Sequence, residues 1–375
     1  MSKHIHISLV GAQPYPIYLA IADLKPDSVV LVHSKATQKE ASLVESEIDV
    51  PTRLLELDPV NIAEIFTEVK NLYESLNHDD TYSINLSGGT KLWSIAFYEY
   101  FRNLNHVKLV YVDQNNLIYD LRTQKCYRSV VAVDMDQTFR LNGVSTTSFD
   151  RLEEYTDEDC YNSNRLFQLR SIYNLALRSL SVLDKYKMKE IMDNEIGCLK
   201  VYSNRLKWDK NTNTIEVHLV NGDKKTNQKF ISPHVFRLFF YTGWFELKVA
   251  KLLSQWKYAK EIRLSVKFPY ILDENPKNEI DIIVNTGNRL LFVECKTQIA
   301  NITDIDKFRT AVKNYGGMSS KALFVTLDPM KGTAAEKCSD SGILAFSISD
   351  ARKESNYRVE LFSMLEKELF EINKK

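Results

Sequence analysis

The sequence predicts an α/β fold that is divided into at least two domains. Three observations carry this prediction: the chain has 375 residues, strand and helix patterns alternate through residues 1–140, and a second series of helix, hairpin, strand, helix and strand patterns starts at Phe236. A chain of this length exceeds the usual size of a single domain. Hydrophobic residues make up 44% of it, so each domain can bury a core of its own.

The elements of the first 140 residues follow from the spacing of their apolar side chains. Val29–His33 begins with four consecutive aliphatic residues, which is typical of a strand buried in a parallel sheet. Ile62–Leu76 carries apolar side chains at helical spacing. The other predicted elements are the strands Ile5–Val10, Thr52–Leu57, Thr81–Leu86 and Val107–Val112 and the helix Lys91–Leu104. This alternation predicts a parallel sheet, and such sheets bind ligands at the carboxyl ends of their strands.

The middle of the chain has a different pattern. Residues 141–165 predict a linker, because a polar stretch is followed by a patch of five acidic residues, namely Glu153, Glu154, Asp157, Glu158 and Asp159. A basic helix is expected over Arg165–Leu183, with strands near Ile215–Val220 and Lys229–Ile231. Asn221-Gly222-Asp223 is a hairpin turn signal.

The cysteines and the N-terminus indicate the compartment. The five cysteines, Cys126, Cys160, Cys198, Cys295 and Cys338, include no C-x-x-C pair, which fits reduced thiols and predicts no zinc site. The first apolar run is too short and too alternating for a signal peptide, and no apolar stretch is long enough for a membrane helix. We therefore expect a soluble cytoplasmic protein that does not associate with a membrane.

The net charge of zero is the sum of two unlike parts. Residues 1–150 hold 13 basic and 19 acidic residues, a net charge of −6, and residues 151–375 hold 36 and 30, a net charge of +6. Residues 165–267 alone carry 20 basic and 9 acidic residues, a net charge of +11. Neutrality of the whole chain thus does not argue against nucleic-acid binding by its second half.

Two loops at strand ends form the first candidate site. The strand Ile5–Val10 is followed by Gly11-Ala12-Gln13-Pro14, and the strand Thr81–Leu86 is followed by Ser87-Gly88-Gly89-Thr90-Lys91 at the start of a helix. Paired glycines allow a close approach of the backbone, and a helix N-terminus with a lysine favours anions. The second loop is thus a phosphate-binding turn in outline, although it lacks the complete NTPase pattern. A plain glycine turn with Thr90 as the helix cap explains the same residues.

These loops and the Rossmann-like pattern around them resemble a CARF domain over about residues 1–140. CARF domains sense the cyclic oligoadenylates that type III CRISPR systems make. The resemblance implies a homodimer that cradles a symmetric cyclic ligand, with cyclic tetra-adenylate as the suggested one. The ligand-binding residues that it implies are Gly11, Gln13, Pro14, Ser34, Ser87, Gly88, Gly89, Thr90 and Lys91.

The second candidate site is an acidic hairpin that ends in a lysine. Two apolar runs, Asn278–Val284 and Arg289–Thr297, flank the turn residues 285–288. In the second run Glu294 and Lys296 share one strand face, and Leu291, Val293 and Cys295 share the other. A strand that is apolar on both faces is covered, so charges at its end need a partner or a metal. A surface hairpin with scattered charges is the alternative explanation.

Asp281, twelve intervening residues and then Glu294-Cys295-Lys296 resemble the PD-(D/E)xK nuclease motif. Ile280 stands where the motif usually has proline. The family also carries a glutamate on the preceding helix, and Glu246 fits this place, although a solvated helix charge is its simpler explanation. The resemblance implies catalysis by Glu246, Asp281, Glu294 and Lys296. The implied ligands of Mg²⁺ or Mn²⁺ are Glu246, Asp281, Glu294 and the Cys295 carbonyl, whereas the Cys295 side chain is expected in the core.

Together these features predict a CARF sensor domain at 1–145, a basic connector at 146–235 and a restriction-endonuclease-like domain at 236–375. The predicted function is that of a cyclic-oligoadenylate-activated nuclease in antiviral defence, acting on single-stranded or supercoiled DNA, on RNA, or on both. In the connector, basic residues alternate with Tyr186, Tyr202 and Trp208, as in strand-binding grooves. Two alternatives stay open, an ungated repair or restriction nuclease and a nucleotide-sensing regulator with an inactive nuclease fold.

Overall fold

The computed structural model describes residues 2–77, 79–132, 134–269, 276–297, 302–330, 332–348 and 354–370. The chain forms two compact units. The first comprises residues 1–146 with the short segments 285–290 and 310–320, and the second comprises 147–284, 291–309 and 321–375. The boundaries that we predicted for three domains stay predictions.

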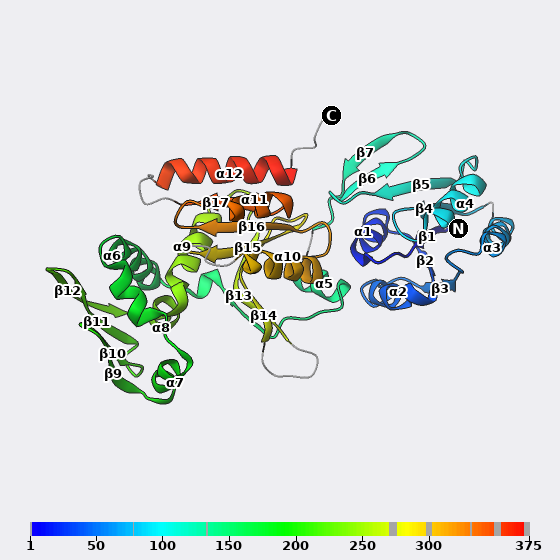
Figure 1. The fold of residues 1–375 in the computed structure, drawn as a ribbon. Helices are drawn as coiled ribbons and strands as arrows, with labels where there is room; N and C mark the ends of the chain where they lie inside the picture. Colours follow the sequence, from blue (N-terminus) through cyan, green and yellow to red (C-terminus); the bar gives the residue numbers. More distant parts are fainter. Residues whose placement is uncertain are drawn as a thin grey trace. The chain divides into compact units, whose positions relative to one another are not determined.

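The first unit is built on a seven-stranded sheet with the order β3-β2-β1-β4-β5-β6-β7 (Figure 1). Its strands are β1 (His4–Leu9), β2 (Ser28–His33), β3 (Thr52–Glu56), β4 (Thr81–Asn85), β5 (Val107–Val112), β6 (Leu117–Asp120) and β7 (Lys125–Arg128). The first five strands pair in parallel, whereas β6 and β7 extend the sheet as antiparallel strands. The predicted Rossmann-like sheet is therefore confirmed.

Four helices lie between the first five of these strands in the sequence, and a fifth follows β7. They are α1 (Pro14–Leu24), α2 (Gln38–Glu45), α3 (Ile62–Glu74), α4 (Lys91–Phe101) and α5 (Met135–Leu141), with the 3₁₀ helix η1 (Lys35–Thr37) before α2. Buried side chains of α3 and α4, including Ile65, Trp93 and Phe97, form one core with Ile7 and Leu9 of β1. The helix α1 starts directly at Pro14, because a proline in the first turn lacks only a hydrogen bond that no helix start makes.

The second unit contains a six-stranded sheet with the order β17-β16-β15-β14-β13-β8. Its strands are β8 (Ser148–Arg151), β13 (Glu261–Pro269), β14 (Pro276–Asn285), β15 (Leu290–Lys296), β16 (Lys321–Thr326) and β17 (Leu344–Ser347). The accompanying helices are α9 (Gly243–Leu253), α10 (Thr303–Gly316), α11 (Thr333–Asp340) and α12 (Glu354–Phe370). The predicted hairpin is thus β14 and β15, and β15 is buried along most of its length.

The same unit has a smaller antiparallel sheet with the order β12-β11-β10-β9. It comprises β9 (Ile196–Val201), β10 (Asn204–Asp209), β11 (Thr214–Asn221) and β12 (Lys224–Ile231), accompanied by α6 (Asp157–Ser181), α7 (Lys185–Asp193), α8 (Val235–Phe239) and the 3₁₀ helices η2 (Leu152–Glu154) and η3 (Phe240–Thr242). The predicted turn at residues 221–223 joins β11 to β12, since Asn221 pairs with Lys224.

The predicted linker at 141–165 is wrong for most of its length. Residues 148–151 form β8, which pairs with β13 at the edge of the larger sheet. The acidic patch does not mark a flexible connection either, because Asp157 starts the helix α6 and Thr156 caps it through a reciprocal contact with Asp159. Acidic residues are favoured in the first helical turn, where they interact with the helix dipole. The acidic patch therefore marks the start of a helix and not a linker.

Candidate functional site

The second unit has a cavity of about 890 Å³ that gathers all four residues of the predicted nuclease motif. Glu246 comes from α9, Asp281 from β14, and Glu294 and Lys296 from the end of β15. The four side chains share this cavity although 50 residues of chain separate the first from the last. Glu279 of β14 and three further basic residues, Lys210, Arg237 and Lys267, also line it.

The two neighbouring strands hold Asp281, Glu294 and Lys296 close together. The Asp281 carboxylate accepts a hydrogen bond from the backbone N–H of Cys295 at 2.7 Å, which fixes it beside the end of β15. Lys296 Nζ lies 2.6 Å from Glu294 Oε1 and 4.0 Å from Asp281 Oδ2. The exposed fractions of the Asp281 and Glu294 side chains are only 14% and 15%. The motif therefore forms a compact charged cluster instead of a set of scattered surface charges.

A strained turn before α9 brings Glu246 to the same cavity. Tyr241 and Thr242 have φ angles of 50° and 70°, which side chains other than glycine rarely adopt. A Cβ atom on Gly243 would lie 2.1 Å from the carbonyl oxygen of Arg237, so only glycine fits there. Across this turn, Arg237 Nη2 lies 3.8 Å from Glu246 Oε2. The strained residues therefore lie beside the candidate site, where strained backbone is often found in proteins.

Arg237 is a functional candidate that the sequence reasoning missed. Its guanidinium contacts Asp150 of β8 and Ser265 of β13 in addition to Glu246. No sequence motif signals it, because Asp150 and Ser265 are distant in the sequence and the contact with Glu246 depends on the turn between α8 and α9. Glu279 was also missed, although it precedes Asp281 by two residues and so projects from the same strand face.

Burial shifts the ionisation of the clustered carboxylates. Desolvation, followed by repulsion from Asp281, raises the pKa of Glu294 to about 7. Desolvation and the charge of Asp281 also raise the pKa of Glu246, against the opposing effect of Arg237. The pKa of Asp281 rises as well, since burial outweighs the attraction of Lys296. Burial alone would lower the pKa of Lys296, but Asp281 and Glu294 raise it, so this lysine is a cation at neutral pH.

We predict that these shifts make the stability of the metal-free protein depend on pH. Because the folded-state pKa of Glu294 lies above its ordinary value of 4.5, this group favours the folded state below pH 4.5, and its contribution is lost as the pH rises through 7. The free energy of unfolding of the wild type should therefore fall between pH 5 and pH 8. The variant Glu294→Gln cannot ionise at this position, so its free energy of unfolding should fall by on the order of 1 to 3 kcal/mol less over the same pH range. Urea unfolding in EDTA measures this difference.

The exposed Glu368 on α12 provides the control for this measurement. Glu368→Gln should keep the wild-type slope of stability against pH. Parallel slopes for Glu294→Gln and the wild type would contradict the assigned shift.

The donor set of the cavity fits a hard divalent cation. Glu246, Asp281 and Glu294 supply carboxylate oxygens, which Mg²⁺ and Mn²⁺ prefer. Burial, followed by the charge of Asp281, raises the pKa values of Glu246 and Glu294, and a bound cation would favour their charged forms. Among the described residues, no three acidic, histidine or cysteine side chains already stand in a metal-binding arrangement. Lys296 would have to release Glu294 for the carboxylates to converge.

Cys295 lies where the sequence predicted it. Its side chain belongs to the buried core together with Leu291 and Val293, on the strand face opposite Glu294. Burial, followed by the charge of Asp281, raises the pKa of the Cys295 thiol well above its usual range. A thiol that stays protonated is not a nucleophile, so the chemistry of the cavity rests on its carboxylates and its lysine.

In the first unit, the two predicted loops touch at one edge of the sheet. The strands β1 and β4 are parallel neighbours at the point where the strand order reverses, so their carboxyl ends meet. A Cβ atom on Gly88 would lie 2.1 Å from the Leu9 carbonyl oxygen, and one on Gly11 would lie 3.0 Å from the Gly89 nitrogen. Gly89 has a φ of +70°, and a Cβ there would lie 2.5 Å from the Trp93 ring. The paired glycines are therefore required by the close packing of the loops.

The hydroxyl groups of these loops mostly serve the fold. Ser87 Oγ contacts Asn85 and accepts the Val112 backbone N–H at 2.6 Å. Thr90 caps α4 by accepting the Trp93 backbone N–H at 3.3 Å. Ser34 lies at the end of β2 and bonds to Thr37. Lys91 is exposed at the first position of α4, so that its ammonium and the helix N-terminus can face an anion.

Gln13 and Pro14, the other two predicted residues of the first loop, lie at the start of α1. Gln13 is half-buried at the N-cap position of this helix, where its side chain makes no capping hydrogen bond. Pro14 is buried as the first helical residue. The loop therefore presents Gln13 rather than Pro14 at the sheet edge.

The fold and the two sites define a class, a CARF domain joined to a second α/β domain that carries a carboxylate and lysine cavity. Residues 5–135 match the family model of the Card1 CARF domain, so the N-terminal part of the chain is a CARF domain. The N-terminal assignment made from the two loops is thereby confirmed. A search of curated proteins gives no match.

Three solved structures share the fold of nearly the whole chain. Can2 from Sulfobacillus thermosulfidooxidans, in complex with cyclic tetra-adenylate, is 18% identical with a TM-score of 0.66 over 98% of this chain and 100% of that chain. The protein VC1899 from Vibrio cholerae is 15% identical with a TM-score of 0.72 over 97% and 98% of the two chains. A type III CRISPR defence DNA nuclease activated by cyclic oligoadenylate is 13% identical with a TM-score of 0.57 over 96% of this chain and 52% of that chain.

Within the described residues, no helix combines the length and the hydropathy of a membrane span.

Proposed function

We propose that this chain is a metal-dependent endonuclease that a cyclic oligoadenylate activates in type III CRISPR defence. The observation that carries the proposal is the single cavity that collects Glu246, Asp281, Glu294 and Lys296 in a chain that also has a CARF domain. The reaction is the hydrolysis of a phosphodiester in DNA, in RNA or in both. A water oxygen bonds to phosphorus, one backbone P–O bond breaks, and the leaving oxygen takes a proton.

Each group in the cavity has a role in this reaction. Mn²⁺ or Mg²⁺ held by Glu246, Asp281, Glu294 and the Cys295 carbonyl would polarise the phosphate and acidify a water molecule. Lys296 is cationic and lies 2.6 Å from Glu294, so it can stabilise the negative charge that grows on the phosphate oxygens. Arg237 lies against Glu246 and holds this carboxylate toward the cavity.

The CARF loops are proposed to bind cyclic tetra-adenylate. Because residues 1–150 carry a net charge of −6, the overall field of this domain does not attract a polyanion, and local groups have to bind it. Gly11, Gly88 and Gly89 expose backbone at the sheet edge, and Lys91 supplies a positive charge beside it. The ligand would also contact Gln13 at the start of α1, whereas Pro14 and Ser34 are buried and would act by supporting the loops.

The basic region after residue 165 is proposed to meet the nucleic acid. The helix α7 carries Lys185, Lys187 and Lys189, and its residues Met188 and Ile191 form part of the cavity wall. Tyr186 and Tyr202 are exposed, with 86% and 88% of their surfaces accessible, whereas Trp208 is buried. Exposed aromatic rings beside lysines suit the stacking of bases on a single strand. The two tyrosines, but not Trp208, are therefore available to a substrate.

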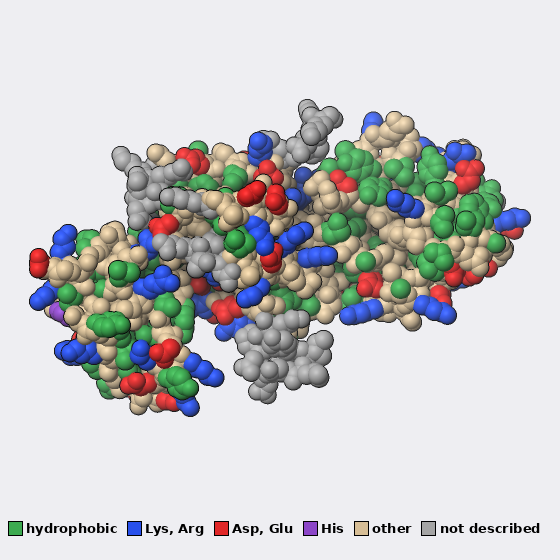
Figure 2. All heavy atoms as spheres, in the orientation of Figure 1, with side chains coloured by type: hydrophobic (Ala, Val, Ile, Leu, Met, Phe, Trp, Pro, Cys, Tyr) green, Lys and Arg blue, Asp and Glu red, His purple; other side chains and the backbone are tan. Residues whose placement is uncertain are grey.

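A homodimer is proposed on the evidence of the CARF surface. Ile95 and Tyr98 lie on one face of α4 and are 58% and 41% exposed, and Ile62 at the start of α3 is 57% exposed. Figure 2 shows hydrophobic side chains gathered over the N-terminal domain on the face in view. Exposed apolar clusters of this kind often mark protein interfaces.

The variant Ile95→Glu tests this surface. A buried, unpaired carboxylate in a dimer interface is costly, so the variant should be monomeric where the wild type is dimeric, as measured by light scattering after size exclusion. Thr67→Glu, an exposed change on α3, is the control and should leave the mass unchanged. A wild-type monomer, or a dimeric Ile95→Glu variant, would contradict the assignment.

The proposed function is tested by a cleavage panel. Purified protein is incubated with single-stranded DNA, RNA and supercoiled plasmid in Mn²⁺, with and without cyclic tri-, tetra- and hexa-adenylate. The proposal requires cleavage of at least one substrate that depends on both the metal and a cyclic oligoadenylate.

A further inference from the structure

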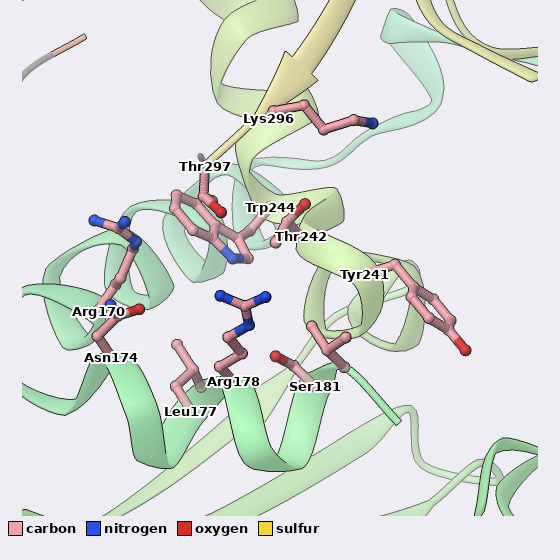
Figure 3. A pocket seen from close by; sticks show the side chains of 11 residues that line it. Arg170, Asn174, Leu177, Arg178, Ser181, Tyr241, Thr242, Trp244, Lys296 and Thr297 are labelled. Atoms are coloured by element: carbon pink, nitrogen blue, oxygen red, sulfur yellow. The ribbon is translucent and has the colours of Figure 1, made fainter. Parts of the chain in front are cut away.

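A second cavity of about 330 Å³ adjoins the proposed catalytic cavity within the second unit. Its floor is the α6 face that carries Arg170, Asn174 and Arg178, and its other wall includes Trp244 of α9 and Thr297 after β15. Figure 3 shows the Arg178 guanidinium directed from α6 into the middle of the pocket, toward Trp244 and Thr242. A cavity of this size can hold a group as large as one nucleotide unit, since ligand pockets range from roughly 300 to 1,000 Å³.

The two cavities share part of their walls. Tyr241 and Lys296 line both of them, so the second cavity begins where the predicted catalytic lysine lies. The shared wall is the strained turn at Tyr241 and Thr242, whose positive φ angles let α9 start close to α8. A strand that passes the catalytic cavity can therefore continue directly into this one.

The two cavities differ in charge. The catalytic cavity is lined by side chains of both signs: four carboxylates, those of Glu246, Glu279, Asp281 and Glu294, and four cations, those of Lys210, Arg237, Lys267 and Lys296. Among the residues that the structure describes, two arginines and Lys296 line the second cavity and no acidic side chain does. An anionic group therefore meets side chains of both signs in the catalytic cavity, whereas the described charged side chains of the second cavity are all cations that attract it.

Arg178 is the side chain best placed to bind such an anion. Arg170 already forms an ion pair with Asp328 at 2.9 Å, so part of its charge is compensated. The Arg178 guanidinium is exposed and makes no hydrogen bond or ion pair with any residue that the structure describes. A guanidinium with all of its donors available matches the geometry of a phosphate group.

We propose that this second cavity binds the phosphodiester next to the one that is cut, and that Arg178 is its main ligand. The inference rests on the proposed nuclease function and adds a substrate-positioning site to it. It requires that the enzyme binds at least two consecutive phosphates of one strand, one beside Lys296 and one at Arg178. A charge-assisted contact of this kind contributes roughly a tenfold or larger gain in affinity.

The test measures binding and cleavage with a series of modified substrates. Each member of the series is a single-stranded 12-mer, of DNA or of RNA, in which one phosphate is replaced by a neutral methylphosphonate. In the Glu294→Gln background, binding is followed by fluorescence anisotropy. We expect Arg178→Ala to weaken binding of the unmodified strand about tenfold and to lower the slope of log affinity against log salt by about 0.7.

The position of the neutral phosphate identifies the contact. A methylphosphonate next to the cleavage site should weaken binding of the strand to the protein that retains Arg178. The same methylphosphonate should not weaken binding to Arg178→Ala any further, because the contact is already lost. In cleavage by the otherwise wild-type enzyme, Arg178→Ala should raise KM with little change in kcat. Arg178→Lys should restore part of the affinity, because it keeps the charge without the fork of donors.

Several outcomes would overturn the inference. Lys367→Ala, on α12 and outside both cavities, is the matched control, and an equal loss in that variant would mean a general charge effect. If the loss of affinity caused by Arg178→Ala adds to the loss caused by every methylphosphonate, Arg178 contacts none of the replaced phosphates. If only methylphosphonates at the strand end weaken binding, the cavity binds a terminal phosphate instead. If the wild type cuts nothing under any activator, the proposed function fails, whereas normal cleavage with unchanged Arg178→Ala kinetics removes only this inference.

Discussion

Glu294→Gln is expected to lower activator-dependent cleavage by roughly a thousandfold while the protein stays folded. The amide keeps the size of the side chain but removes one of the three carboxylates that would hold the metal. It also removes the anion that lies 2.6 Å from Lys296 Nζ, so the lysine loses its orientation in the cavity. Both effects act on the transition state, so the loss should appear in kcat rather than in KM.

Two controls make this result specific. Glu368→Gln on α12 should cleave like the wild type. Binding of cyclic tetra-adenylate by Glu294→Gln should be unchanged, as measured by calorimetry, because the residue belongs to the second compact unit. Cleavage by Glu294→Gln above a tenth of the wild-type rate would remove Glu294 from the active site.

Lys91→Glu is expected to raise the concentration of cyclic tetra-adenylate needed for half-maximal activation by about a hundredfold or more. The reversal replaces a cation at the mouth of the glycine loop with an anion, which would repel the phosphates of a ligand bound as proposed, and each charge-assisted contact contributes about 1.5–3 kcal/mol. The acidic domain around it offers no compensating field, since residues 1–150 carry a net charge of −6. Activity at saturating ligand should approach that of the wild type.

Lys125→Glu is the matched control for this effect, because it makes the same charge change on the exposed strand β7. It should leave the activation curve in place. An equal shift in both variants would mean that only the total charge of the domain matters, and no shift in Lys91→Glu would place the ligand away from the glycine loop.

Much of the fold could be predicted because its signals are local. The strands β1, β2, β4 and β5 and the helices α3 and α4 carry continuous or periodic apolar patterns that determine their type. The short strand β8 could not be predicted in the same way, because Ser148–Arg151 is polar and becomes a strand only by pairing with β13, over a hundred residues further along the chain. The helix α1 was missed because two prolines in its first turn look like a loop.

The candidate site could likewise be predicted only where its contacts are local in the sequence. Asp281, Glu294 and Lys296 lie on two strands joined by a short turn, so their spacing in the sequence already indicates their proximity in space. The contact of Arg237 with Glu246 depends on a turn in which Tyr241 and Thr242 adopt positive φ angles. Propensities argue against that conformation for such residues, so only the folded structure reveals it. The cavity around Arg178 likewise depends on how α6 packs near α9.

The central claim, that a cyclic oligoadenylate switches on a metal-dependent nuclease, is tested most directly by one titration. Cleavage of a labelled single strand is followed in Mn²⁺ as cyclic tetra-adenylate is raised from zero, with an EDTA series alongside. We expect no cleavage without ligand, a saturable rise with ligand and complete loss in EDTA. Cleavage at the same rate without ligand would make the enzyme an ungated nuclease, and no cleavage of DNA or RNA at saturating ligand would contradict the nuclease assignment itself.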